Sequence, residues 1–539
     1  MSSTYYFLIK FILNFVGAAD TIEINYNEKH SDVPAPYLPT ECMLEIFKHV
    51  QAQGSGLYSC LLVNRYWCKN VIPLLCSRPF KSLVSENRYK LIHTYLACLD
   101  HEEYSSLNSS LKSYDIEIPE ISLPLFNYPM CLKEFSYKQL EIAVHSTIHL
   151  WYNKTFINRH KQDQILLITT TLCKLFMRRS ISLKSFMMDK YFSHLDIPRI
   201  STFITKPGLS QLTRFQIDYC KPMTANTIQL LEKLPDLCSN IRCLDVKFPI
   251  FEQNHKAISR IIKTQRHLNE FNLSGVRIGS ETILVSLQSR HESLNILRLE
   301  NVYITETCFN ALTLCKNLKD LSIWYCKGLE IENTSVLLKS KFSLKKLRLG
   351  VLPICSDVAG LILQVGGTSL KELEIDLINP IIVETILNCC SNVKELKLVN
   401  YFPHDNNHLF HQLFSGLRLE TLEIFINSKN LDYEDMKLIG KDLPPSLKSL
   451  KLKCGFTFEQ FKELFRTCNA PLETIIIDYL DLNYEHIKVI TRFIKNKKTV
   501  KVLGIVGMDD MTSQEIKEIK ILKKRHGIFI IPSHELNLW

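Results

Sequence analysis

The strongest candidate for chemistry in this sequence is a group of histidines at helical spacing. If residues 404–411 form a helix, His404, His408 and His411 lie on one face beside Asp405. Imidazole and carboxylate groups are typical zinc ligands. The segment falls between two predicted strands, however, where an exposed polar helix face explains the same residues. We favour the exposed face over a metal site.

Other catalytic patterns are weaker or absent from the sequence. Glu141, His145 and His149 share a helical face, but no third imidazole or thiol lies near them in the chain. No nucleophile elbow, phosphate-binding glycine loop or HExxH motif occurs. Basic clusters at 495–498 and 523–525 fit solvated helix faces. We therefore expect a protein without enzymatic activity, metal or cofactor.

Composition indicates a folded protein built from several domains or a repeat array. The chain has 539 residues, of which 46% are hydrophobic and 22% charged. Its formal net charge of +10 comes from 65 basic and 55 acidic residues spread along the chain, so the charge does not indicate nucleic-acid binding. Eighteen cysteines occur without a CxxC pair, which favours reduced thiols in the cytoplasm or nucleus.

The N-terminus leaves the compartment open. An apolar run from Phe7 to Val16 precedes Gly17, Ala18 and Ala19, which is the outline of a secretory signal peptide. No basic residue precedes the run, Lys10 interrupts it, and it is too short to span a membrane. Export and an atypical N-terminal extension of a cytoplasmic or nuclear protein both remain possible.

Residues 38–80 contain two predicted helices with more apolar surface than they can bury alone. Pro39 suits the first turn of a helix whose apolar residues recur at three- and four-residue steps. After the break at 54–56, a second helix is predicted to begin at Leu57. Its apolar side would carry Leu61, Leu62, Val63 and Trp67. These helices require a further apolar surface, supplied by the rest of the chain or by another protein.

The residue order of this segment is specific. It reads LPxE at 38–41, IF at 46–47 and VNRxW at 63–67. This order resembles an F-box, the helical motif that docks substrate receptors on the Skp-type adaptor of a cullin-RING ubiquitin ligase. Gly56 and Cys76 depart from the family, which commonly has Asp and Trp at these positions. The resemblance implies adaptor binding by Leu38, Pro39, Met43, Leu44, Ile46, Phe47, Leu57, Leu61, Val63 and Trp67.

Downstream, one apolar phrase recurs twelve times. Its copies are Leu212-Phe215-Ile217, Ile241-Leu244-Val246, Leu268-Phe271-Leu273, Leu294-Leu297-Leu299, Leu318-Leu321-Ile323, Leu344-Leu347-Leu349, Leu370-Leu373-Ile375, Val393-Leu396-Leu398, Leu419-Leu422-Ile424, Leu447-Leu450-Leu452, Leu472-Ile475-Ile477 and Val500-Leu503-Ile505. The mean spacing of about 26 residues is typical of leucine-rich repeats. A weaker copy lies at Leu183, Phe186 and Met188.

The segments between the copies predict helices. Thr457 with Gln460 forms a capping-box pattern, and Ser280, Thr305, Ser356 and Asn483 are predicted as equivalent caps. Recurring cysteines precede the strands and suit a packing role; they are Cys238, Cys315, Cys390 and Cys468. The fold class is thus α/β, with a strand and a helix in each repeat of a solenoid.

We expect four regions along the chain. Residues 1–36 form an apolar extension and linker, 37–80 the F-box, 81–180 a helical connector, and 181–539 the leucine-rich-repeat solenoid with its C-terminal cap.

The concave strand face of the solenoid is the predicted surface for a target protein. Side chains between the inward leucines point away from the core. The candidates are Arg298, Glu300, Asp320, Trp324, Lys346, Arg348, Glu372, Glu374 and Asp376. Trp324 could be an exposed anchor of the kind that dominates interfaces, or could pack against Tyr325. Blocks of opposite charge favour a ligand with complementary blocks.

Together these features predict a substrate receptor of a Skp-cullin-F-box ubiquitin ligase. Its partners would be the Skp-type adaptor, the cullin-RING ligase reached through it, and a target protein. The alternative is a leucine-rich-repeat interaction scaffold, possibly exported, with no ubiquitin role.

Overall fold

The computed structural model describes most of the chain between residues 39 and 531. It leaves out 53–56, 81–87, 115, 119–122, 152–160, 190–195, 205–206, 219–223, 248–254, 351–354, 377, 400–406, 426–432, 454–455, 479–481, 506–511 and 527. The residues before 39, including Leu38 and the apolar run, lie outside the described residues, as do His404 and Asp405.

The chain forms two compact units. The first comprises residues 1–249 and 264–268, and the second comprises 250–263 and 269–539. Within each unit, consecutive strands pair in parallel and follow chain order. Parallel pairing between successive strands requires a crossover segment, which the helices provide.

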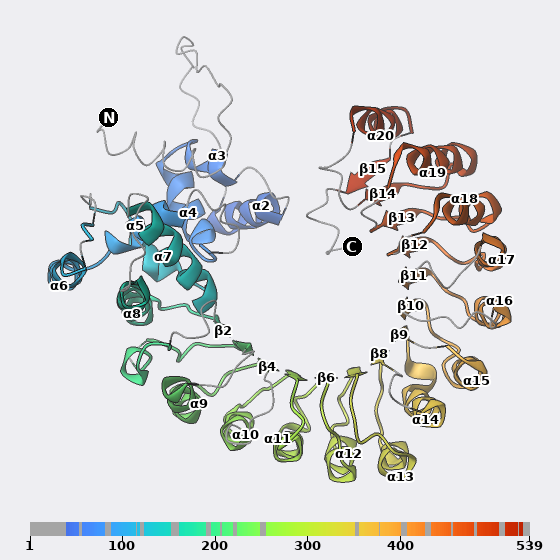
Figure 1. Cartoon of the computed structure of the whole chain (residues 1–539), viewed down its shortest axis with the longest axis horizontal. Coiled ribbons are helices and arrows are strands. Elements are labelled where there is room, and N and C mark those ends of the chain that lie inside the picture. The colour runs from blue at the N-terminus through green and yellow to red at the C-terminus, as the bar shows by residue number, and fades with distance from the viewer. Residues whose placement is uncertain are drawn as a thin grey trace. The chain divides into compact units, whose positions relative to one another are not determined.

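The first unit begins with helices and ends with repeats (Figure 1). Its elements are α2 (Thr40–Ala52), α3 (Leu57–Leu61), α4 (Arg65–Leu75), α5 (Arg88–Leu96), α6 (His101–Lys112), η2 (Tyr128–Cys131), β1 (Glu134–Ser136), α7 (Tyr137–Trp151), α8 (Lys161–Arg179), β2 (Ser185–Asp189), η3 (Ile200–Thr202), β3 (Arg214–Asp218), α9 (Ala225–Leu237) and β4 (Cys243–Lys247).

The second unit alternates helices and strands throughout, and Figure 1 shows its helices on one face of its sheet. Its elements are α10 (His255–Thr264), β5 (Glu270–Ser274), α11 (Ser280–Ser286), η5 (Leu287–Arg290), β6 (Ile296–Glu300), α12 (Glu306–Thr313), β7 (Asp320–Trp324), α13 (Ile331–Thr334), η6 (Ser335–Lys339), β8 (Lys346–Leu349), α14 (Ser356–Gly366), η7 (Gly367–Ser369), β9 (Glu372–Ile375), α15 (Pro380–Cys389), β10 (Glu395–Val399), α16 (Asn407–Gly416), β11 (Thr421–Phe425), α17 (Tyr433–Asp442), β12 (Ser449–Leu452), α18 (Phe458–Thr467), β13 (Thr474–Ile477), α19 (Tyr484–Lys497), β14 (Val502–Ile505), α20 (Ser513–His526) and β15 (Phe529–Ile531).

The repeat prediction is confirmed. Each of the twelve copies places its last two apolar residues in a strand, from β3 to β14, and the weaker copy is β2. These side chains are buried, as Leu347 and Leu349 illustrate. The structure adds β1 and β15, which the predicted copies do not include. Leu132, Phe135 and Tyr137 around β1 repeat the same phrase, so the signal was present within the predicted helical connector.

Two of the predicted helix caps are made by side chains, and three are not. Thr457 and Gln460 form the capping box of α18, and Asn483 accepts from backbone amides of α19. Thr305 occupies the N-cap of α12 without a side-chain cap bond. Ser280 and Ser356 are instead the first residues of α11 and α14, which follow Gly279 and Cys355. A serine near the start of a predicted helix therefore did not identify which residue is the N-cap.

The recurring cysteines are buried at the predicted phase of the repeat. Cys238 and Cys390 hold their thiols near the backbone oxygens of Leu234 and Leu363. Burial raises the pKa of both thiols to about 12, which keeps them protonated. A packing role accounts for this placement.

A chain of aromatic rings forms a continuous core through the first unit. Tyr95 of α5 contacts Phe176 of α8 with ring centroids 4.9 Å apart. Phe176 contacts Phe135 of β1 at 5.5 Å, and Phe135 stacks on Phe186 of β2 at 5.4 Å. Phe80 also lies against Tyr95, at 6.1 Å. The end of the 38–80 segment, the connector helices and the first strands thus share one core.

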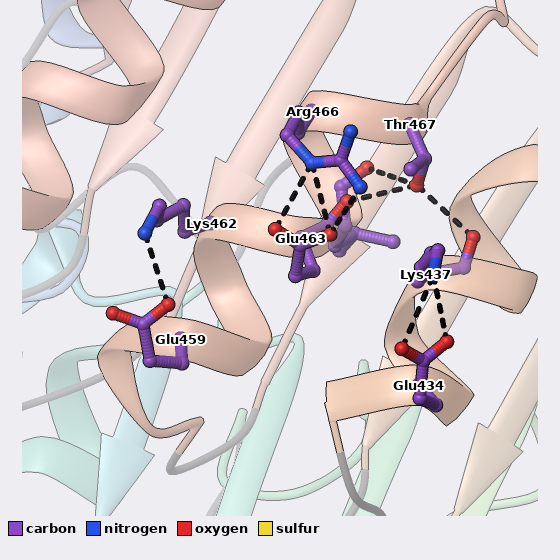
Figure 2. A network of polar contacts seen from close by, with 8 residues as sticks. Glu434, Lys437, Glu459, Lys462, Glu463, Arg466 and Thr467 are labelled. Atoms are coloured by element: carbon purple, nitrogen blue, oxygen red, sulfur yellow. Dashed lines mark hydrogen bonds and ion pairs between the residues drawn. The ribbon is translucent and has the colours of Figure 1, made fainter.

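Helices α17 and α18 pack closely because α17 has a glycine at the contact. A Cβ atom on Gly440 would lie 2.6 Å from the carbonyl oxygen of Leu464 and would also meet Thr467 Oγ1. Thr467 uses this proximity to donate to the carbonyl oxygen of Lys437 at 3.0 Å (Figure 2). Ion pairs within each helix, such as Glu463 with Arg466, surround this contact.

We predict that Gly440→Ala destabilises the fold by about 1–3 kcal/mol, because the added methyl group must push the two helices apart. The loss should outweigh the helix propensity of Ala, which alone would favour the variant by about 1 kcal/mol. Denaturant unfolding of the full chain measures the difference. Gly366→Ala in α14 is the control, since its Cβ would meet Leu370 only at an ordinary 3.5 Å. Equal stability of wild type and Gly440→Ala contradicts the close packing.

Candidate functional site

The first candidate surface is the three-helix segment α2 to α4. In α2, Met43 and Phe47 lie one turn apart and are both buried, while Ile46 between them is exposed. The carbonyl oxygen of Pro39 accepts from the amide of Met43 at 3.1 Å, which closes the first turn. Glu41 lies in that turn, where the helix dipole stabilises its negative charge.

The predicted single helix from Leu57 is wrong, because the chain turns at 62–64 and two helices form. Asn64 has an extended backbone, with φ −166°, and its side chain accepts from the amide of Trp67 at 2.8 Å. This cap starts α4 and ends the helical run that the apolar pattern suggested. As a consequence, Leu62 and Val63 lie in the turn and point to solvent.

The three helices have a core of their own. Phe47 of α2 meets Trp67 of α4 edge to face, with ring centroids 5.1 Å apart. Leu57 and Leu61 of α3 are buried, as are Val71 and Ile72 of α4. Apart from Trp67, which is half-buried, these side chains are therefore already covered within the chain.

The expected adaptor-binding residues divide by exposure. Met43, Phe47, Leu57 and Leu61 are buried. Leu44 and Trp67 are half-buried, and Pro39, Ile46 and Val63 are exposed. The structure also exposes Leu62 and Tyr66, which the sequence pattern did not single out for a partner. We call Ile46, Leu62, Val63 and Tyr66 the exposed apolar set; Val63 is the most exposed of the four, at 55%.

The second candidate surface is the strand face of the second unit, where charged side chains pair across neighbouring strands. Arg298 of β6 lies between two carboxylates: its guanidinium donates to Glu270 of β5 and, at 2.9 Å, to Asp320 of β7. Burial raises the pKa of Asp320, and the charge of Arg298 opposes that rise. The pair thus keeps a partly buried carboxylate ionised more readily than burial alone would allow.

The pairing continues along the sheet as an alternating ladder. Arg348 donates to Glu374 at 2.9 Å, and Lys397 lies 3.6 Å from Glu374. The remaining contacts join Lys397 to Glu423 at 3.4 Å, Lys453 to Glu423 at 3.4 Å, and Lys453 to Asp478 at 3.9 Å. In a separate pair, Lys346 contacts Glu372 at 2.6 Å. We call this series, from Glu270 to Asp478, the charge ladder.

Trp324 is not an exposed anchor. Its side chain is only 4% exposed, and the guanidinium of Arg348 lies 4.2 Å from its ring centroid. Tyr325 meets it edge to face at 5.4 Å, which is the alternative packing that the sequence allowed. Gly350 leaves the necessary room, since a Cβ there would lie 3.1 Å from the indole. Asp376, also expected on the surface, is buried as well.

The charge ladder changes what the strand face can recognise. Most of the predicted target-binding charges already have a partner of opposite sign within the sheet, so a ligand must compete with those pairs. Exposed strand-face groups outside the ladder include Glu300, Glu395 and Phe425. These groups are the better candidates for selective contact with a target.

Metal or catalytic chemistry gains no support from the part of the chain that the structure describes. No group of three or more potential ligands is placed to hold a metal ion among the described residues. His408 is exposed, and His411 lies 3.1 Å from Asp442. On α7, Glu141 is fully buried and His149 is exposed, so these two do not share a site. Within the same described segments, no helix has the length and apolar character needed to cross a membrane.

Comparison with known proteins gives no family assignment. No family model matches the sequence, and no curated protein sequence matches it. Solved structures match at low scores, and the Rad7–Elc1 complex is among them. The Rad7–Elc1 complex from yeast matches with 12% identity and a TM-score of 0.36, over 92% of this chain and 98% of that one.

Two further similar structures are bacterial proteins. The leucine-rich-repeat-containing protein LegL7 from Legionella pneumophila has 15% identity and a TM-score of 0.35, over 58% of this chain and 97% of its own. An internalin from Listeria monocytogenes has 13% identity and a TM-score of 0.29, over 57% of this chain and 83% of its own. These scores are too low to support any argument about function.

We predict that Arg298→Ala destabilises the protein by about 1 kcal/mol at neutral pH, because it leaves the carboxylate of Asp320, 14% exposed, without its cation. The pKa of Asp320 in the folded protein is already above its ordinary value, so the folded state binds a proton more readily than the unfolded state. Protonation of Asp320 therefore removes the unpaired charge. The loss of unfolding free energy in the variant should shrink as pH falls from 7 toward about 4.

Denaturant unfolding at both pH values measures this effect. Lys112→Ala is the control, because its partner Glu117 is 83% exposed and water can replace the lysine. The control should lose less stability and show little change with pH. The same pH response in both variants would count against the charge ladder as a structural element.

Proposed function

We propose that this chain is the substrate-recognition subunit of a cullin-RING ubiquitin ligase of the Skp-cullin-F-box type. The α2–α4 segment would bind the Skp-type adaptor, and the strand face of the second unit would hold a target protein. Catalysis would belong to the partners, and this chain would contribute proximity and orientation.

The observation that carries the proposal is the exposed apolar set on a segment whose other apolar side chains are mostly covered. Phe47 and the leucines of α3 are buried and Trp67 is half-buried against Phe47, yet Ile46, Leu62 and Val63 remain in contact with water. Apolar side chains gathered on so small a segment favour a protein partner. The residue order LPxE, IF and VNRxW indicates which partner, because it resembles the motif that binds the Skp-type adaptor.

We expect the full chain to co-purify with a Skp-type adaptor, and the double variant Leu62→Glu with Val63→Glu to lose at least about tenfold in affinity, since two carboxylates would be buried against apolar surface. Binding is measured by titration of purified adaptor. Leu338→Glu is the control: Leu338 lies in η6 of the second unit and is 52% exposed, so the same change should leave adaptor binding intact.

Equal thermal midpoints for the three proteins would establish that lost binding is not lost folding. If wild-type protein does not bind the adaptor, or if the double variant binds like wild type, the receptor proposal is wrong. The remaining candidate would then be a leucine-rich-repeat interaction scaffold, which needs only the strand face and no adaptor.

A further inference from the structure

A pocket in the first unit is lined by cationic and neutral hydrogen-bonding side chains. Its volume is about 190 Å³, and its lining residues are Lys184, Gln211, Thr213, Asn240, Arg242 and His267. None of these described lining residues carries a carboxylate. The pocket lies far along the chain from the exposed apolar set and outside the charge ladder, so it belongs to neither surface described above.

The repeat geometry explains why these side chains converge. Leu212 and Ile241 are completely buried, and each is flanked by two pocket residues, one on either side in sequence. The flanking residues face away from the core: Gln211, Asn240 and Arg242 are exposed, and Thr213 is half-buried. Each of these repeats therefore contributes a pair of polar side chains to one surface.

Backbone hydrogen bonds fix the order of the central residues. The amide of Thr213 donates to the carbonyl oxygen of Lys184 at 2.8 Å, and the amide of Arg242 donates to that of Thr213 at 2.7 Å. A short hydroxyl side chain thus lies between two long cationic ones. All three of these side chains line the pocket.

A buried glutamine fixes the side of the pocket that Asn240 and His267 form, which we call the outer wall. Gln265 is fully buried, and its side-chain oxygen accepts from the amide of Ile241 at 2.9 Å. Its side-chain nitrogen donates to the carbonyl oxygen of Cys238 at 3.3 Å. These bonds link the segments that carry Asn240 and His267. The wall is therefore ordered before any ligand arrives, which reduces the entropic cost of binding.

The charge of the pocket is not neutralised within the described structure. No described carboxylate forms an ion pair with Lys184, Arg242 or His267, whereas the cations of the charge ladder each contact a carboxylate on a neighbouring strand. Lys184 and Arg242 lie on either side of Thr213, and their like charges repel one another, so leaving them unpaired weakens the fold. An anionic ligand would remove that cost.

We propose that this pocket binds a phosphate group, either free or as a phosphate monoester. A phosphate carries about −1.5 to −2 charge at neutral pH and three strong acceptor oxygens. The lining offers matching donors: an ammonium, a planar guanidinium that can bind two oxygens at once, and two amides. The hydroxyl of Thr213 already donates to the carbonyl oxygen of Lys184 at 3.1 Å. The cavity volume of about 190 Å³ is large enough for one such group. A carboxylate would leave more of these donors unmatched.

Isothermal titration of the full chain with inorganic phosphate, at constant ionic strength, tests the proposal. Wild-type protein should bind in a saturable manner with one site, and Lys184→Ala and Arg242→Ala should each weaken binding at least about tenfold. Arg242→Lys keeps the charge but loses the planar fork, so an intermediate affinity is expected. Lys345→Ala is the control, because Lys345 is an exposed lysine immediately before β8 in the second unit and outside the pocket.

Two further titrants identify the source of the phosphate. Tighter binding of O-phosphoserine than of inorganic phosphate supports a phosphorylated side chain, and the reverse supports free phosphate. Acetate at equal ionic strength should bind at least about tenfold more weakly. The proposal fails if phosphate binding does not saturate, if acetate binds as well as phosphate, or if Lys345→Ala weakens binding as much as Arg242→Ala. Matching circular dichroism spectra confirm that each variant is folded, and adaptor binding, being at another segment, should not change.

Discussion

The structure depends on rows of buried apolar side chains that no single repeat can cover. Leu347 and Leu349 of β8, for example, align with Leu321 and Ile323 of β7 and with Leu373 and Ile375 of β9. A repeat alone would leave these residues in water, so burial requires neighbours in register. Because side chains alternate along a strand, this register also aligns the intervening polar residues in rows that run across the strands. Successive residues in a row lie on neighbouring strands, about 4.8 Å apart. The charge ladder follows from the packing of the apolar core.

The same constraint operates differently in the first unit. There, large rings replace leucines, and Phe80, Tyr95, Phe176, Phe135 and Phe186 contact one another in succession. Helices of the connector thereby bury their aromatic residues against the first strands. The α2–α4 segment has its own core around Phe47 and Trp67, which leaves the exposed apolar set available to another protein. Docking of a partner on that set would not require the core to open.

Much of the repeat architecture could be predicted because its signal is local and recurs. Period-two apolar residues at a spacing of about 26 identified the strands from β2 to β14. The pattern was overlooked around Phe135, where neighbouring helical segments obscured a single short strand. It was misleading after Leu57, because Asn64 caps a new helix inside an apolar run that would otherwise continue. The hydrogen bond of this one polar side chain starts a new helix, although the apolar positions on either side of it fit a single one.

The sequence by itself determined the repeat, its register and the residues that face away from the core, since these depend on alternation along each strand. Only the tertiary structure decided what those outward residues do. Arg348 covers Trp324 from the next strand, and Arg298 joins Glu270 to Asp320 across three strands. Lys184 and Arg242, by contrast, form no ion pair with a carboxylate among the described residues. Such partners lie a full repeat or more away in the chain, and long flexible side chains choose among them by distance in space, which the order of residues does not contain.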